Sequence, residues 1–503
     1  MTRQLLQKLT VKKNEAQLFR LVVVVAAVVA GMISLWIGLR QSLWFDEIYS
    51  ILLAKQPIGE LLRLTALDTH SPLYYILLKG WASLFGWSEL SLRAASVGSM
   101  MLSIVIGGLL LRRMFGTRLA IGGLLLVMIA PLLLRYGFEV RMYADASLAG
   151  IAATYALYSA WQASGRRRVW WLVAYGLLVA AGTYLLYYLV FLWLAHVVWL
   201  LYVHLRRKQP WKALLPYVAA YAGAVALFMP WLPAFIGQLS NGAMAPIGLP
   251  LNLENLLGVA SFNLFYQPLY MVSVGVTVIA IAVAAALVWA IPRARQALKG
   301  KGDEVALLIM YIGVPIVLLM GISLFLPMYT ERYLSHVAIG LMLLLGVIVT
   351  AAVQHSGRQR NRAVWMLVIV YGAVLIGTVH LINMGNFNFQ RFQMPMAKEA
   401  AAGLATCAPG SRLLAEDPFV AIELSHYLPD CPVYFVIQWQ TLSGGYVWLS
   451  GSSRQVKDVN TLTDPRITYV YYDVPEQPLP DAYKEHNRRE YGALKVVEYR
   501  RLK

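Results

Sequence analysis

The stretch LVVVVAAVVAGMISLWIGLRQSLWFDEIYS, residues 21–50, determines the class of fold. Its part from 21 to 39 is apolar and long enough to cross a hydrocarbon core of about 30 Å as a helix. Two adjacent carboxylates, Asp46 and Glu47, follow directly. Ionisable groups at the edge of a bilayer are costly unless they interact with a partner, so this pair is the first candidate for function.

Apolar runs of similar length recur along the 503-residue chain, which is 59% hydrophobic. They predict a polytopic α-helical membrane protein with about eleven spans, at residues 20–39, 91–111, 119–134, 143–163, 169–184, 187–205, 213–235, 269–291, 304–326, 334–354 and 364–383. The pair 169–205 has a second interpretation as one long kinked helix. That would give ten spans and move the C-terminal residues to the other side of the membrane.

The net charge of +18 follows the expected membrane topology. With a cytoplasmic N-terminus, the inner segments hold 22 Lys and Arg against three acidic residues, as the positive-inside rule predicts. The charge therefore argues against a nucleic-acid partner. We expect a multi-pass plasma-membrane protein with these loops on the extracytoplasmic side: 40–90, 135–142, 236–268 and 327–333.

The pattern changes after residue 383, and we place a domain boundary there. Residues 1–383 form the membrane domain, whose external loop 40–90 is predicted to carry helices along the membrane surface. Residues 384–503 predict an extracytoplasmic C-terminal α/β domain, because they contain short β-like runs at 412–416, 433–437, 467–474 and 493–500. Its Cys407 and Cys431 are either one disulfide or two buried thiols, and the role of this domain is left open.

Three of the predicted external loops contribute four groups of polar side chains, namely Asp46 and Glu47, Asp68 and His70, Arg135, Glu139 and Arg141, and Glu331 and Arg332. A carboxylate can act as a general base toward a hydroxyl, and guanidinium groups can bind a phosphate. Each group also has a structural interpretation: a helix cap at 46–47, an ion pair of Glu139 with Arg141, or an Arg332 that reaches lipid headgroups. No second His or Cys accompanies His70 at ligand spacing, so no metal site is predicted.

Three motifs carry a family resemblance: the Asp-Glu pair after the first span, DTHSPLYY (68–75) and EVRMYA (139–144). They resemble the polytopic glycosyltransferases of the GT-C superfamily, in the group of protein O-mannosyltransferases and lipid A aminoarabinose transferases. The resemblance covers about 20–350 and is absent from the C-terminal domain. The family turn often reads H-P-P or K-P-P, whereas Ser71 precedes a single Pro72 here.

The resemblance implies transfer of a sugar, a hexose or pentose, from a polyprenyl-monophosphate donor in the membrane. A lipid, glycan or protein acceptor would receive it on the extracytoplasmic face. Asp46 would be the catalytic base, supported by Glu47, and Glu139 a second essential acid. The substrate-binding residues would be Asp68, His70, Arg141, Tyr143, Arg332 and Tyr333. No cofactor is required by the sequence, although a divalent cation is compatible with these acids.

Three other functions fit a polytopic protein less well. A transporter or flippase of lipid-linked sugars would need polar groups at midspan, often in repeated halves, and the sequence has few of the former and no repeat. A sensor domain on a membrane anchor would not need so many spans. A polymerase or ligase acting on polyprenyl-diphosphate glycans differs only in the number of donor phosphates.

Overall fold

The computed structural model describes residues 3–240, 252–266, 273–384, 396–404, 410–436, 454–472, 475 and 477–502. The chain divides into two compact units. The helical unit comprises Met1–Trp36, Arg93–Pro233 and Ala245–Asn383. The loop–sheet unit comprises Ile37–Leu92, Ala234–Met244 and Met384–Lys503. The predicted loop 40–90 thus groups with the C-terminal residues.

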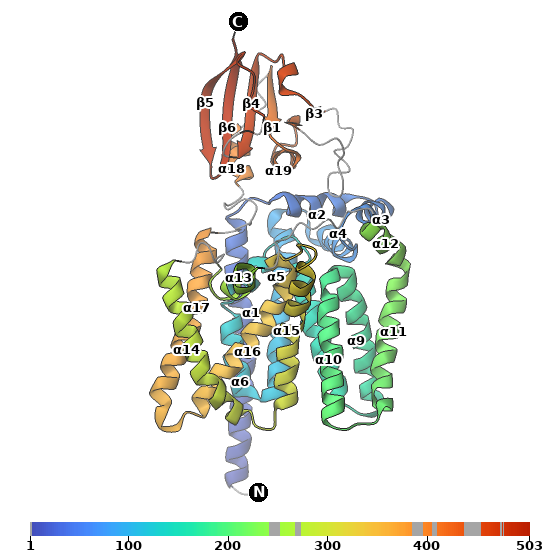
Figure 1. Ribbon diagram of the computed structural model, residues 1–503, viewed down its shortest axis with the longest axis vertical. Coiled ribbons are helices and arrows are strands. Elements are labelled where there is room, and N and C mark those ends of the chain that lie inside the picture. The colour runs from blue at the N-terminus through green and yellow to red at the C-terminus, as the bar shows by residue number, and fades with distance from the viewer. Residues whose placement is uncertain are drawn as a thin grey trace. The chain divides into compact units, whose positions relative to one another are not determined.

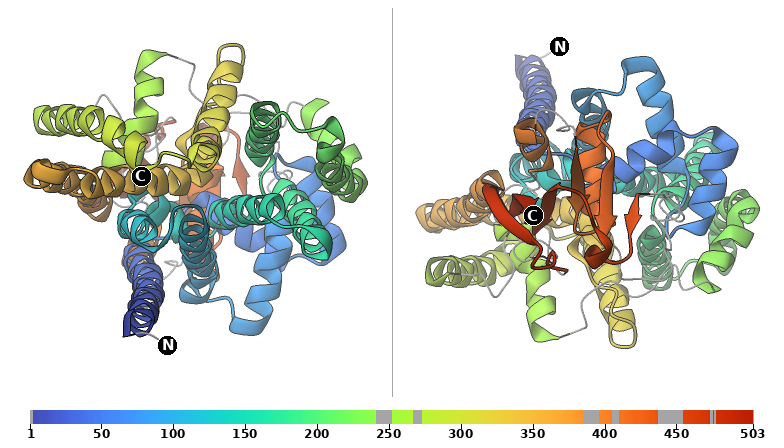
Figure 2. Two further views of the ribbon diagram at one scale, coloured as in Figure 1. Left: turned by 90° about the horizontal axis from the view of Figure 1, so that it is seen from below. Right: turned by 90° about the horizontal axis from the view of Figure 1, so that it is seen from above.

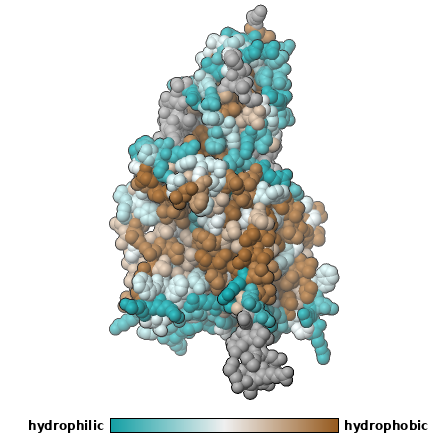
Figure 3. Space-filling view, turned by 180° about the vertical axis from the view of Figure 1, so that it is seen from behind, coloured by the Kyte–Doolittle hydropathy of each residue, from teal (hydrophilic) through white to brown (hydrophobic). Residues whose placement is uncertain are grey.

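The helices of the helical unit run side by side in Figure 1 and are seen close to end-on in Figure 2. They are α1 (Arg3–Leu39), α5 (Glu89–Phe115), α6 (Thr117–Val127), α7 (Pro131–Gly137), α8 (Tyr143–Gln162), α9 (Gly165–Leu185), α10 (Val190–Arg206), α11 (Leu215–Phe228), α12 (Leu232–Ser240, shared with the other unit), α13 (Leu253–Phe265), α14 (Val274–Ala297), α15 (Gly302–Ser323), α16 (Ser335–Gln354) and α17 (Arg360–Met384). The sides of this unit are largely hydrophobic in Figure 3, and hydrophilic residues gather at its lower helix ends. This surface suits lipid around the helices and water at their ends.

Within the described part of the chain, nine helices are long and apolar enough to cross a membrane. The number is ten if α6 and α7, which meet at a 65° bend, form one broken span. One of the eleven expected spans, 143–163, fails this test. It forms the helix α8, which is not apolar enough to be counted. Most of its side chains are buried by neighbouring helices, so it needs no continuous apolar surface toward lipid. The predicted polytopic fold is confirmed, with nine or ten spans by this test.

Residues 169–205 form two helices, α9 and α10, rather than one kinked helix. The two run antiparallel, because the Tyr175 hydroxyl lies 3.1 Å from His196 Nδ1 and the Trp193 indole N–H donates to Thr183. Elsewhere α6 and α16 approach at backbone distance. A Cβ on Gly346 would lie 2.5 Å from the Cα of Gly123, so only glycine fits there.

The loop–sheet unit begins with three short helices, α2 (Phe45–Lys55), α3 (Ile58–Leu67) and α4 (Leu73–Phe85). The last two are the helices predicted in the external loop. The Lys79 ammonium joins α4 to the end of α2, since it donates to the carbonyls of Ala54 (3.2 Å) and Gln56 (2.9 Å).

The C-terminal residues form a sheet whose described strands number six, in the order β3-β2-β1-β4-β6-β5. Strands β1, β2, β3 and β4 run parallel, whereas β6 pairs antiparallel with both β4 and β5. The bounds are β1 (Ser411–Ala415), β2 (Val433–Val436), β3 (Gln455–Val456), β4 (Arg466–Tyr472), β5 (Tyr483–Tyr491) and β6 (Leu494–Arg501), with helices α18 (Ala397–Leu404) and α19 (Pro418–Tyr427). The predicted α/β domain is therefore confirmed.

Each face of this sheet has its own core. Helices α18 and α19 cover one face, where Ala400 and Leu424 pack with Phe435 and Val470. The other face forms a second cluster that includes Tyr469 and Val497. Cys431, just after α19, is disulfide-bonded. Cys407 lies outside the described residues.

Candidate active site

Helix α2 carries the two adjacent carboxylates Asp46 and Glu47 in its first turn. The Asp46 side chain is half-buried, whereas Glu47 is fully buried. A Glu47 carboxylate oxygen accepts a hydrogen bond of 3.2 Å from the backbone N–H of Trp44, the residue that precedes the helix. Glu47 thus caps the helix from which Asp46 projects, and carboxylates at this end also interact favourably with the helix dipole.

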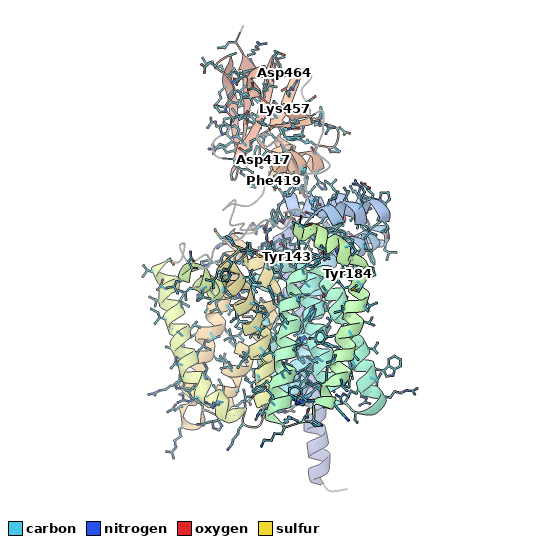
Figure 4. All side chains as sticks on the ribbon, turned by 45° about the vertical axis from the view of Figure 1, so that its right-hand side comes forward. Tyr143, Tyr184, Asp417, Phe419, Lys457 and Asp464 are labelled. Carbon is cyan, nitrogen blue, oxygen red and sulfur yellow. The ribbon has the colours of Figure 1, made fainter. Side chains whose placement is uncertain are left out.

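Side chains of the C-terminal helix α19 also contact the start of α2. The buried Glu423 of α19 accepts a hydrogen bond of 2.9 Å from the backbone N–H of Phe45, and the Tyr427 hydroxyl accepts one of 2.7 Å from that of Leu43. Phe419, labelled in Figure 4, packs edge-on against Phe45 with ring centroids 4.5 Å apart. Burial raises the pKa of Tyr427, so its hydroxyl stays protonated. Helix α19 therefore satisfies backbone donors next to Asp46.

The DTHSP turn between α3 and α4 brings together Asp68 and His70. His70 Nδ1 lies 3.1 Å from Asp68 Oδ2 and 2.9 Å from the hydroxyl of Thr69. The turn is fixed by Gln238, a buried amide in α12, which donates to the carbonyls of Thr65 (2.9 Å) and His70 (3.0 Å). The carboxylate can select one tautomer of the imidazole ring.

Ser71, the residue that departs from the family turn, is buried. Among the described residues its hydroxyl has no hydrogen-bond partner. Buried hydroxyls in folded proteins are nearly always paired, so this group is available to a bound water or substrate.

In the helical unit, α7 and the segment that follows it bury an ion pair. Arg135 Nη1 lies 2.6 Å from Glu139 Oε2, and both side chains are at most 5% exposed. The Arg135 guanidinium also lies over the rings of Tyr136 and Phe138. The backbone N–H of the buried Arg141 donates to the Glu139 carbonyl at 2.7 Å, which makes a tight turn. Glu139 is thus held by Arg135.

Tyrosines connect this turn to the segment that begins α16. Tyr143, labelled in Figure 4, packs edge-on against Tyr136 with ring centroids 5.0 Å apart. The Tyr136 hydroxyl donates to Glu331 at 3.1 Å. Farther along, Tyr333 stacks on Tyr188 at 4.0 Å, and the Arg332 guanidinium lies 5.9 Å from the Tyr333 ring. Glu139, Tyr143 and the half-buried Glu331 therefore belong to one group of polar side chains.

Residues 330–336 contain an unusual number of unsatisfied polar atoms. Thr330 Oγ1, Glu331 Oε2, Ser335 Oγ and both ring nitrogens of His336 are buried and have no hydrogen-bond partner within the described ranges. Leaving one buried polar group unpaired costs about 1–3 kcal/mol, so five such atoms in one segment mark a place for waters or a polar ligand.

The sequence-predicted site residues lie in both units. The loop–sheet unit holds Asp46, Glu47, Asp68 and His70, and the helical unit holds Glu139, Arg141, Tyr143, Arg332 and Tyr333. In the part of the chain that is described, no group of three or more His, Cys, Asp or Glu side chains could hold a metal ion.

Four further residues emerge only from the structure: Gln238, Ser335, His336 and Glu423. Each is a polar residue buried in an otherwise apolar stretch. That property is a weak sequence signal, because a single buried polar residue is most often satisfied locally. Nothing in the sequence shows that Glu423 contacts a backbone group 378 residues away.

Sequence comparison finds one family. A family model described as dolichyl-phosphate-mannose-protein mannosyltransferase matches residues 69–233, which include the DTHSP turn from Thr69 onward and the 135–143 segment. No curated protein matches the chain.

Solved structures share the fold over most of the chain. ArnT from Cupriavidus metallidurans in the apo state has a TM-score of 0.63 at 13% identity, covering 96% of this chain and 98% of that one. The same protein bound to undecaprenyl phosphate has a TM-score of 0.63 at 13% identity, covering 95% of this chain and 97% of that one. A third match is the archaeal oligosaccharyltransferase AglB from Archaeoglobus fulgidus, in complex with an inhibitory peptide and a dolichol-phosphate. Its TM-score is 0.53 at 12% identity, covering 81% of this chain and 63% of that one.

The ArnT match extends the likeness into the C-terminal domain, where the sequence motifs show none. The chain thus has the fold of the polytopic GT-C glycosyltransferases over nearly its whole length, and its resemblance to that superfamily is confirmed.

Proposed function

We propose that the protein is an integral membrane glycosyltransferase of the plasma membrane. It transfers a sugar from a polyprenyl-monophosphate donor to a hydroxyl of a lipid, glycan or protein acceptor on the extracytoplasmic face. The observation that carries this proposal is the group of polar side chains at 135–143 and 330–336, where arginines and carboxylates accompany buried, unsatisfied polar atoms. The matches to a mannosyltransferase family and to ArnT bound to undecaprenyl phosphate support it.

The proposed chemistry has two requirements. The acceptor hydroxyl must lose its proton as it attacks the anomeric carbon, and Asp46 is the proposed base. The departing phosphate gains negative charge, which Arg141 and Arg332 stabilise through charge-assisted hydrogen bonds. Glu47 keeps α2 capped, and Glu139 acts as the second essential acid.

Asp68 and His70 are proposed to contact the donor from the DTHSP turn, with the buried Ser71 hydroxyl as a further contact. Tyr143 and Tyr333 are further proposed substrate contacts. Because arginines supply the positive charge, the proposal needs no cofactor. A chelator should leave transfer unchanged, and activity lost to the chelator and restored by a divalent cation would contradict this point.

Mass spectrometry of co-purifying lipids tests the proposal. We compare the wild-type protein, Asp46→Asn, and the control Glu60→Gln, whose exposed carboxylate pairs with Arg63 one turn along α3. A polyprenyl-monophosphate sugar enriched in Asp46→Asn alone supports both the donor class and the role of Asp46. A diphosphate-linked glycan would assign the protein to the polymerase or ligase class instead. Equal recovery of the sugar lipid from all three proteins would contradict catalysis by Asp46 and favour a transporter.

A further inference from the structure

A cavity of about 240 Å³ lies on the C-terminal sheet, at the end of the face that α18 and α19 cover. Its lining includes Ser411, Arg466, Thr468, Arg489 and Arg500. Ligand pockets for drug-sized molecules have about 300–1,000 Å³, so this cavity suits a smaller group, such as one monosaccharide.

Register places three cations side by side across neighbouring strands. Arg466 of β4 lies directly opposite Arg500 of β6, and Arg500 lies directly opposite Lys484 of β5. Ser411 of β1 continues the same row beside Arg466. Directly opposed side chains have Cβ atoms about 4.5–5.5 Å apart, and like charges at this spacing destabilise a sheet. The row therefore lowers the stability of the unliganded domain.

Three other arginines of the same sheet are neutralised by carboxylates. Arg412 lies 2.9 Å from Asp464, Arg488 2.7 Å from Glu485, and Arg489 2.8 Å from Glu498. Arg466 and Arg500 differ from these, since no carboxylate among the described residues pairs with either. Both guanidinium groups line the cavity, beside the ion pair of Arg489 with Glu498.

Arg489 adds a buried donor to this cavity. Its two terminal nitrogens donate to the Gly403 carbonyl (2.6 Å) and to Glu498 (2.8 Å), which fixes the side chain. Its Nε is buried and has no partner among the described residues. The hydroxyl-bearing residues Ser411 and Thr468 share the sheet face of Arg466 by strand alternation. Together they offer fixed donors for an oxyanion and hydroxyls for a sugar.

We infer that this cavity binds an anionic sugar, that is, a monosaccharide bearing a phosphate or a carboxylate group. Arg466 and Arg500 bind the oxyanion, and its charge relieves the repulsion along the row. If the proposed function holds, such a group belongs to the acceptor, and the C-terminal domain contributes to acceptor recognition. Binding itself requires no transfer, so it is measured independently of that function.

Isothermal titration of the full-length protein in detergent tests the inference. The probes are glucose 6-phosphate, glucuronate, glucose and inorganic phosphate. We expect the sugar phosphate or the uronate to bind, and the preference between them identifies the oxyanion. Arg466→Gln and Arg500→Gln should each weaken binding about tenfold or more, as loss of a charge-assisted hydrogen bond does. The control Arg488→Gln, on the opposite face beside Val497, should bind as the wild type does.

Other results would overturn the inference. These are equally tight binding of glucose, equally tight binding of inorganic phosphate alone, no binding of either anionic sugar, or unchanged binding by both arginine variants. A second measurement needs no ligand. Because the row is repulsive, Arg466→Gln and Arg500→Gln should slow hydrogen exchange in β4 and β6 of the unliganded protein, and faster exchange would show that the arginines serve the fold instead.

Discussion

The buried carboxylates of the two units are stabilised by different interactions. In the loop–sheet unit, Glu47 and Glu423 accept hydrogen bonds from backbone N–H groups at the start of α2. In the helical unit, Glu139 is held by a buried guanidinium. When a carboxylate at a helix end is removed, another acceptor can take over its hydrogen bonds. When one partner of a buried ion pair is removed, the charge of the other partner is left uncompensated. We therefore expect changes near α2 to alter activity more than stability, and changes near Glu139 to alter both.

The largest effect should come from Asp46→Asn. Loss of a general base lowers turnover by about 10²–10⁴-fold, while the amide leaves the size of the side chain nearly unchanged. Transfer is measured with the co-purified sugar lipid, and folding by thermal unfolding in detergent. Unchanged turnover would reject Asp46 as the base. A parallel loss in the Glu60→Gln control would show that the assay responds to the surface charge of the loop.

Glu139→Gln should lower both stability and activity. The variant removes one partner of the buried Arg135–Glu139 ion pair, and breaking a buried pair costs about 3–5 kcal/mol. Thermal unfolding measures the loss. The double variant Arg135→Met/Glu139→Met removes both charges and should recover most of the stability without recovering transfer. If transfer also returned, Glu139 would have only a structural role.

A smaller effect is expected for Glu423→Ala, which leaves the Phe45 N–H without its acceptor at a cost of about 1–3 kcal/mol. Hydrogen exchange at the start of α2 should speed up and turnover should fall, whereas Glu423→Gln should keep most of both. The matched control is Glu416, whose carboxylate accepts from the backbone N–H of Tyr472 within the sheet. Glu416→Ala should not change exchange in α2, and an equal change in both variants would contradict a local role.

The smallest effect concerns pH. Burial, assisted by Lys55 and opposed by Glu89, lowers the pKa of His426 in α19 below its ordinary value of 6.5. The unfolded chain then binds the proton more tightly than the folded one, so His426 favours folding fully above pH 6.5 and progressively less as the pH falls below it. Unfolding followed between pH 8 and 5 should show this loss, and His426→Gln should reduce it. An unaltered pH profile in that variant would exclude His426 as the source.

Sequence patterns predicted the elements that depend on local apolar content. The spans and the strands β1, β2, β4 and β6 all contain apolar runs, and α3 and α4 show helical spacing. Strand β5 was missed because YKEHNRREY is almost entirely polar and exposed. It is a strand only because β6 supplies its hydrogen-bond partners. No local pattern carries that information.

The candidate site shows the same division. The spacing of Arg135 and Glu139 by one helical turn is compatible with the observed ion pair, although the sequence equally suggested Arg141 as the partner. The contacts of Gln238 with the DTHSP turn and of Glu423 with α2 join segments far apart in the chain. Only the packing of the folded chain brings such groups together, so residue types could be proposed but these partners could not.

The edge strands of the sheet affect how readily the protein aggregates while it is being synthesised. A free strand edge offers unpaired backbone groups to any other extended chain, and such pairing starts aggregation. Here one edge strand, β3, has only two residues, and the other, β5, has an exposed charged surface and an irregularity between Glu485 and Asn487. Short, charged and irregular edges resist pairing with a neighbouring chain. The polar sequence of β5, which gave no strand signal, thus disfavours pairing between the sheets of neighbouring copies of this domain.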